Sequence, residues 1–311
     1  MRMSSTGERH RWWGVLLCVV GATGFAVKGI FAKLLYAQGW NFESVLCIRA
    51  FTALPIMAIW ASQVINRSDV KRISWSDICL FMFAGWFCYY LGAFLDFKAL
   101  EWIAASIERV LLFAYPSMIV IMHALLSRRR PATRILLALT VTYGGIFLVV
   151  TGLNVDILQA NGVGASLVLG CAATSATYYV IGERVALRIG STLFTLGALT
   201  TATLVLGVHY ALSTAAKVHP LSLQSGTWLG CIVLFSTVIP MLAMAEGVKQ
   251  LGAPRASIIS TIGPPFTILV GNLILGESLI WAQWLGVICI VGGILILELG
   301  KFSQPATTPT A

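Results

Sequence analysis

The sequence predicts an all-α, polytopic membrane protein whose ten transmembrane helices form two inverted five-helix repeats, with both termini in the cytoplasm. Three observations lead to this prediction: an apolar composition, apolar runs long enough to cross a bilayer, and a match between the two halves at one constant spacing. Of the 311 residues, 58% are hydrophobic and only 11% are charged, whereas a soluble domain carries about a quarter charged residues. The mean hydropathy is +0.87.

Breaks in the apolar runs divide the chain into ten expected spans of about 20 residues, the length that crosses the hydrocarbon core as a helix. The first run, from Trp12 to about Leu35, is too long for a signal peptide, so we expect it to remain as a span. A β-barrel would show short strands of alternating hydrophobicity, and no such period occurs. The expected spans are 12–36, 43–63, 75–98, 102–126, 132–152, 161–182, 191–212, 226–248, 254–275 and 281–299.

The two halves of the sequence match at a constant offset of 148 residues. The matching pairs are Gly14-Val15 with Gly162-Val163, Pro116 with Pro264, and Gly144-Gly145 with Gly292-Gly293. One spacing held across half the chain indicates duplication of a five-span unit. Because five is odd, the second copy enters the membrane upside down. We therefore expect a cytoplasmic N-terminus (1–11), a first repeat (12–152), a second repeat (161–300) and a disordered cytoplasmic tail (301–311).

The basic residues indicate which loops face the cytoplasm. With the N-terminus inside, the N-terminus, the inside loops and the C-terminal tail hold 15 of the 21 Lys and Arg residues, as the positive-inside rule requires. The segment "SRRRP" (127–131) and its counterpart "LGESL" (275–279) then face opposite sides. This difference in side explains why one kept arginines and the other a glutamate.

The net charge of +9 is explained by these cytoplasmic loops, so we expect membrane lipid and a small-molecule substrate as partners, and no nucleic acid. All seven cysteines fall within expected spans and are not spaced as metal pairs. They are interpreted as small apolar packing residues, and no metal or cofactor is expected. A monomer is sufficient for the expected architecture, and the sequence does not determine an oligomeric state.

The segment "LGAPRASIISTIGPPFTILVGNLILGESLIWAQWLGVICIVGGILIL" (251–297) combines a small-residue entry, a mid-span proline, Leu-Gly-Glu and a glycine-rich last helix. With ten expected spans and two repeats, it resembles the EamA-like bacterial branch of the drug/metabolite transporter superfamily. The resemblance implies a multi-pass carrier of small metabolites in the inner membrane, often an exporter of amino acids or related compounds. The first copy departs from the family by placing Arg128-Arg129 at the Gly-Glu position and by adding Glu108-Arg109 within its span.

Ionisable residues inside the expected spans are the strongest indication of a functional site. Placing such a side chain in a bilayer raises the free energy unless it is paired or hydrated. By the topology above, all of them lie in the outer half of the first repeat, where we expect a polar vestibule. They are Lys28, Lys33, Arg49, Asp96, Lys98, Glu101, Glu108 and Arg109.

Lys28 is predicted to attract a substrate carboxylate, and Arg49 and Arg109 are predicted to lie with it in the substrate-binding cavity. The alternative for Lys28 is a pair with Glu108 or Asp96, or a side chain that reaches out to the interface. Glu108 is the candidate for proton coupling, because desolvation favours the neutral form of a buried carboxyl group. Its alternative role is a structural ion pair with Arg49 or Lys28.

Tyrosines in "WFCYYLGAF" (86–94) and "ATYYVIG" (176–182) lie where the resemblance places cavity-lining spans. Tyr89 and Tyr178 are predicted to line the cavity, together with Tyr115, which follows Glu108 at heptad spacing. Adjacent residues point different ways on a helix, so at most one tyrosine of each neighbouring pair should do so. The alternative is packing or an interfacial belt.

Pro116 and the Pro264-Pro265 pair interrupt the backbone hydrogen bonds near the middle of their spans. Discontinuous helices at matching places in two repeats mark the binding level of many carriers. We therefore interpret these prolines as hinges, with a static packing bend as the alternative.

Together these features predict a secondary transporter of a small polar metabolite (an amino acid, a related zwitterion or an organic anion) that works by alternating access, outward, with a proton as the candidate coupling ion. An uptake carrier, an exchanger or a non-transporting membrane subunit are the alternatives. An enzyme is not expected: the four histidines are scattered, and no two acidic residues share a helix at i, i+3 or i+4.

Overall fold

The computed structural model describes residues 5–65, 73–128, 132–213 and 220–302, and within these ranges every regular element is a helix. The helices of the first half are α1 (Ser5–Ala26), α2 (Lys28–Ala37), α3 (Phe42–Val64), α5 (Trp75–Phe83), the π-helix η1 (Ala84–Leu91), α6 (Gly92–Ala99), α7 (Ala105–Leu112), α8 (Tyr115–Ser127) and α9 (Thr133–Thr151). Those of the second half are α10 (Val155–Ile189), α11 (Ser191–Leu212), α12 (Leu223–Val233), the π-helix η2 (Leu234–Val238), α13 (Ile239–Leu251), α14 (Ala253–Ser260), α15 (Gly263–Leu275) and α16 (Trp281–Phe302).

Nine helical segments of the described chain are long and apolar enough to cross a membrane, and a shorter apolar helix covers Trp281–Leu297. The all-helical membrane fold expected from the sequence is therefore confirmed. Helix α1 begins at Ser5, earlier than the expected start at residue 12, and α16 extends to Phe302. The rest of the expected tail, and the basic residues of 66–72 and 129–131, lie outside the described residues.

Element boundaries in the two halves repeat the offset found in the sequence. Helices α7 and α14 begin 148 residues apart, α8 and α15 begin and end 148 residues apart, and α9 and α16 begin 148 residues apart. The capping box Ser74/Asp77 recurs as Ser222/Ser225. Both α8 and α15 end at a left-handed residue, Arg128 (φ 51°) and Gly276 (φ 68°) respectively. Arginine rarely adopts this conformation, so the backbone turn is shared although the residue differs.

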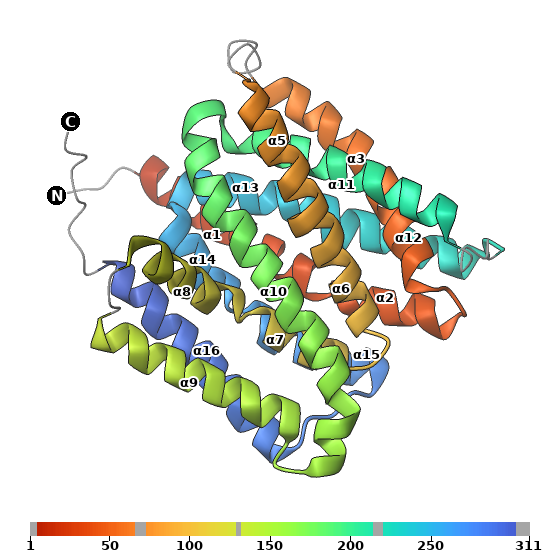
Figure 1. The fold of residues 1–311 in the computed structure, drawn as a ribbon, viewed down its shortest axis with the longest axis vertical. Helices are drawn as coiled ribbons and strands as arrows, with labels where there is room; N and C mark the ends of the chain where they lie inside the picture. Colours follow the sequence, from red (N-terminus) through yellow and green to blue (C-terminus); the bar gives the residue numbers. More distant parts are fainter. Residues whose placement is uncertain (1–4, 66–72, 129–131, 214–219, 303–311) are drawn as a thin grey trace.

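Long helices from the two halves pack in pairs (Figure 1). Helix α9 lies along α16, α3 along α11, α1 against α13, and α10 against α6. Glycines allow the first of these contacts to be close: a Cβ added to Gly145 would lie 2.7 Å from the Gly286 carbonyl oxygen, and one added to Gly286 would lie 2.6 Å from the Gly145 oxygen. Small residues at such crossings are typical of membrane helix packing.

Three spans are interrupted, and they position the candidate site. Helices α7 and α8 are separated at Phe113–Ala114, and α14 and α15 at Thr261–Ile262, each just before a proline at the start of the second helix. The first span is also interrupted, between α1 and α2 at Val27, which the sequence did not predict because no proline lies there. The buried hydroxyl of Thr267 on α15 donates a hydrogen bond to the Ala26 carbonyl at this break, at 2.9 Å.

Candidate functional site

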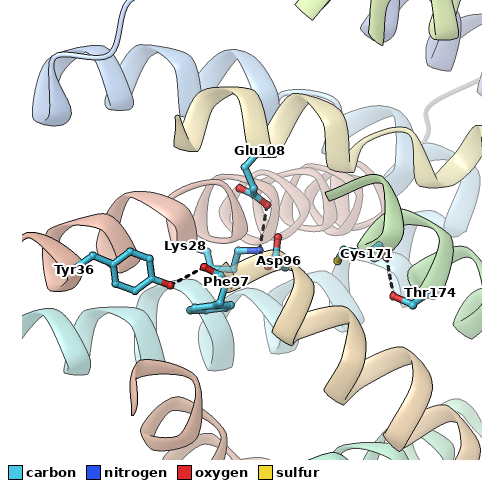
Figure 2. Close-up of polar contacts among 7 residues, drawn as sticks. All are labelled: Lys28, Tyr36, Asp96, Phe97, Glu108, Cys171 and Thr174. Atoms are coloured by element: carbon cyan, nitrogen blue, oxygen red, sulfur yellow. Dashed lines mark hydrogen bonds and ion pairs between the residues drawn. The ribbon is translucent and has the colours of Figure 1, made fainter. Parts of the chain in front are cut away.

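Lys28, Asp96 and Glu108 form a buried ion cluster between three helices. Lys28 is the first residue of α2, directly after the break at Val27, while Asp96 lies on α6 and Glu108 on α7. The Lys28 ammonium donates to Asp96 Oδ2 and lies 3.4 Å from Glu108 Oε1 (Figure 2). The exposed fractions of the three side chains are 13%, 6% and 2%. Both ion pairs that the sequence analysis considered for Lys28 are thus present.

The charges of this cluster do not balance when all three groups are ionised, because one ammonium faces two carboxylates. Uncompensated buried charge is strongly unfavourable. Asp96 Oδ1 is buried and has no hydrogen-bond partner among the described atoms. Binding of one proton would bring the summed charge of these three groups to zero.

Two arginines flank the cluster, each held against an aromatic ring. The Arg49 guanidinium lies 4.9 Å from the Phe97 ring centroid, and the Lys28 ammonium lies 5.7 Å from the same ring. Arg109 lies 5.2 Å from the Phe113 ring. The buried Nε atoms of Arg49 and Arg109 have no hydrogen-bond partner among the described atoms. Their N–H groups are therefore donors that a planar carboxylate fits.

Room for the Arg109 guanidinium comes from a glycine of the other half. A Cβ added to Gly263, the first residue of α15, would lie 3.1 Å from Arg109 Nη2. Pro264 is the next residue, and it is buried, as is Pro116, whereas Pro265 is exposed. The predicted hinge positions therefore lie beside the charged residues, at the two interruptions.

The predicted tyrosines form an aromatic cluster next to Arg109. Tyr89 and Tyr178 meet edge to face at 5.0 Å, and Tyr115 stacks on Tyr179 at 5.3 Å. The Tyr178 hydroxyl is hydrogen-bonded to Thr195 at 2.7 Å. Tyr178 also contacts Tyr179 at 5.8 Å between centroids, so these two neighbours share one cluster.

The Tyr90 hydroxyl is hydrogen-bonded to His209 Nδ1 at 2.5 Å. Tyr89 and Tyr90 both line a small cavity of about 30 Å³ with Arg49, so the expectation that at most one tyrosine of a neighbouring pair lines a cavity is wrong for this pair. A cavity of this size accepts one or two water molecules. A water molecule bound there would lie within reach of the Arg49 side chain.

An open pocket of about 630 Å³ lies at the end of α2. Its lining includes Lys33, Tyr36, Trp40, Glu101 and Glu277. The Tyr36 hydroxyl donates to the Phe97 carbonyl oxygen at 2.9 Å, next to Asp96 (Figure 2). Tyr36 therefore lies between this pocket and the ion cluster.

Sequence reasoning named the charged residues but missed the groups that hold them in place. Tyr36 and Thr267 gave no signal, because a tyrosine or a threonine within an apolar span is common. Glu277 was noticed only as part of the Leu-Gly-Glu segment and was expected in a loop. In the structure its carboxylate accepts hydrogen bonds from Ala105 and Ser106 at the start of α7.

Comparisons with known proteins identify the family. A model of the EamA-like transporter family matches residues 12–151 and 162–299. The chain is 32% identical to the uncharacterized transporter YcbK of Bacillus subtilis, covering 92% of both chains. It is 26% identical to the uncharacterized inner membrane transporter YicL of Salmonella typhimurium, covering 63% of this chain and 64% of that one.

A solved crystal structure has the same fold, with a TM-score of 0.64 and 15% identity over 94% of this chain and 99% of that chain. The family matches cover both halves of the chain and confirm the resemblance recognised in the sequence. The chain is a multi-pass membrane protein that belongs to the EamA-like transporter family.

Proposed function

We propose that the protein is a secondary transporter that moves a small zwitterionic or anionic metabolite, outward, by alternating access. The observation that carries this proposal is the ion cluster Lys28–Asp96–Glu108, buried beside interrupted helices of both halves and flanked by Arg49 and Arg109. A passive structural subunit has no use for buried cations with unpaired donors. The outward direction follows the family resemblance.

The proposed architecture is ten spans in two inverted repeats, 12–152 and 161–300, with both termini in the cytoplasm. It is supported by the element boundaries that recur after 148 residues and by the two separate matches to the family. The distribution of Lys and Arg supports the orientation. Placement in the inner membrane is supported by the relative YicL, which is named an inner membrane transporter.

The proposed substrate chemistry follows from the groups near the interruptions. The guanidinium groups of Arg49 and Arg109 would hold a carboxylate, and Tyr89, Tyr115 and Tyr178 would contact the apolar part of the solute. Glu108 would carry the coupling proton, because it is the more buried of the two carboxyl groups that share Lys28, and desolvation favours the neutral form. Binding of the solute carboxylate near Arg109 would then change the charge balance that Glu108 experiences.

The test is flux from proteoliposomes that contain the purified protein and a panel of amino acids and organic acids, with and without a pH gradient. We expect at least one carboxylate-bearing solute to move faster than in protein-free liposomes, and the pH gradient to accelerate it. Glu108→Gln should abolish the acceleration, whereas Glu246→Gln, at an exposed carboxylate, should preserve it. Absence of flux for every solute in both directions would contradict the proposal.

A further inference from the structure

The carboxylate of Glu277 caps the first turn of α7 from the opposite half of the chain. Its Oε1 accepts the Ala105 backbone N–H at 2.7 Å, and its Oε2 accepts the Ser106 N–H at 3.0 Å and the Ser106 hydroxyl at 2.6 Å. The four N–H groups that begin a helix have no partner within it. Glu277 satisfies two of them and places a negative charge at the positive end of the helix dipole.

Helix α7 is the element that carries Glu108 and Arg109, and it is only eight residues long. Glu108 lies three residues after Ala105, so a shift at the start of the helix moves Glu108 with it. On its other side α7 ends at the interruption before α8. The packing of α7 against α10, α15 and α2 holds its sides, and the cap fixes where its first turn lies.

A glycine makes this cap possible. A Cβ added to Gly271 on α15 would lie 2.8 Å from Ser106 Oγ and 3.0 Å from Glu277 Oε2. The counterpart of Glu277 in the first half is Arg129, which lies outside the described residues. An arginine side chain has no acceptor, so Arg129 cannot cap α14 in the way that Glu277 caps α7.

Glu277 also lines the open pocket, together with Lys33. Glu277 therefore belongs to the second half of the chain, lines the pocket, and bonds to the helix that carries Glu108. We propose that Glu277 is a positioning residue, which holds Glu108 against Lys28 by fixing the start of α7 from the opposite half. A movement between the halves during transport would release Glu108 through this contact.

Proximity between Lys28 and Glu108 can be measured without a transported solute. A lipid-soluble carbodiimide activates a buried carboxyl group, a neighbouring lysine amine attacks the acyl carbon, and the reagent leaves as a urea with an amide bond formed. The whole protein is treated in lipid nanodiscs and then digested, and mass spectrometry of the crosslinked peptides gives the ratio of the Lys28–Glu108 crosslink to the Lys28–Asp96 crosslink. The second crosslink is an internal reference, because Asp96 lies on α6.

We expect Glu277→Ala and Gly271→Ala to lower this ratio at least fivefold and to accelerate amide hydrogen exchange at Ala105 and Ser106. Glu277→Gln, which keeps one acceptor oxygen, should give a smaller change. The matched control is Gly292→Ala, because a Cβ there meets no atom within 4 Å. If Glu277→Ala does not fold, Glu277→Gln and Ser106→Ala provide the same test.

Two results would overturn the inference. If Glu277→Ala accelerates amide exchange but leaves the crosslink ratio unchanged, the cap stabilises the first turn of α7 without positioning Glu108. Unchanged amide exchange would mean that the cap does not form. Only the role of the cap in a transport cycle rests on the proposed function. The crosslink ratio tests the positioning of Glu108 by itself, whatever the flux assay shows.

Discussion

At the scale of single residues, the Lys28 ammonium is the only group that pairs with both Asp96 and Glu108 in the described part of the chain. Removing one partner of a buried ion pair leaves an uncompensated charge, which is far more costly than losing an exposed pair. The cluster is therefore expected to affect both the stability of the fold and its chemistry. The same charge imbalance makes it a candidate for proton binding.

Lys28→Met should lower the free energy of unfolding by about 3–5 kcal/mol, because two buried carboxylates lose their counterion. Adding Asp96→Asn should restore part of the loss, since one of the two charges is then removed. Thermal unfolding of the purified variants measures both effects. Lys249→Met, which breaks an exposed pair with Glu246, is the control and should leave the unfolding temperature unchanged. Equal stability of Lys28→Met and the control would refute the buried pairing.

The sequence identified these charged residues, but it offered the pairing of Lys28 with Glu108 or Asp96 only as an alternative. Lys28, Asp96 and Glu108 were recognisable because ionisable residues are rare inside apolar runs. Which of them pair depends on how α2, α6 and α7 approach one another, and no local pattern encodes that approach. The Glu277 cap is separated from Ala105 by 172 residues, so it too depends on tertiary structure.

At the scale of elements, interrupted helices distinguish this fold from a simple bundle. The breaks before Pro116 and Pro264 follow from local chemistry, since proline lacks the N–H that the helix ladder needs. They could therefore be predicted. The break at Val27 could not, because it is supported by a contact between Thr267 and Ala26.

Thr267→Val should destabilise the protein by about 1 kcal/mol, because it removes the hydroxyl that bonds to the Ala26 carbonyl. Thr203→Val is the matched control: Thr203 is also buried, but its hydroxyl bonds only within its own helix, to the Leu199 carbonyl. Chemical unfolding of both variants compares the two losses. If Thr203→Val is as destabilising as Thr267→Val, the contact across the break has no special role.

The contact between α9 and α16 offers a second matched pair, because adjacent glycines of α9 differ in their surroundings. A Cβ at Gly145 would meet the Gly286 carbonyl oxygen at 2.7 Å, whereas one at Gly144 meets no atom within 4 Å. Gly145→Ala should therefore destabilise the protein by about 1–3 kcal/mol. Gly144→Ala should leave stability unchanged or slightly raised, since alanine favours a helix. Thermal unfolding distinguishes them, and equal effects would contradict the close packing of these helices.

At the scale of the whole molecule, the proposed duplication would account for the recurring order of most elements, although α1 and α2 correspond to the single helix α10. The offset of 148 residues appears in the prolines and glycines of the sequence and again in the boundaries of the helices. A duplicated unit folds twice in the same way because its local signals are copied with it. Charged residues and loops then diverge, as the left-handed turn shared by Arg128 and Gly276 illustrates.

The central claim is that the second copy lies upside down relative to the first. It is tested most directly by attaching a membrane-impermeant maleimide to cysteines introduced singly at the exposed residues Ser127 and Ser278 in intact cells, with the unsubstituted chain as the blank for native thiols. We predict that Ser278→Cys is labelled from outside and that Ser127→Cys is labelled only after the membrane is permeabilised. Labelling of both positions from the same side would contradict the inverted architecture and the transport mechanism that depends on it.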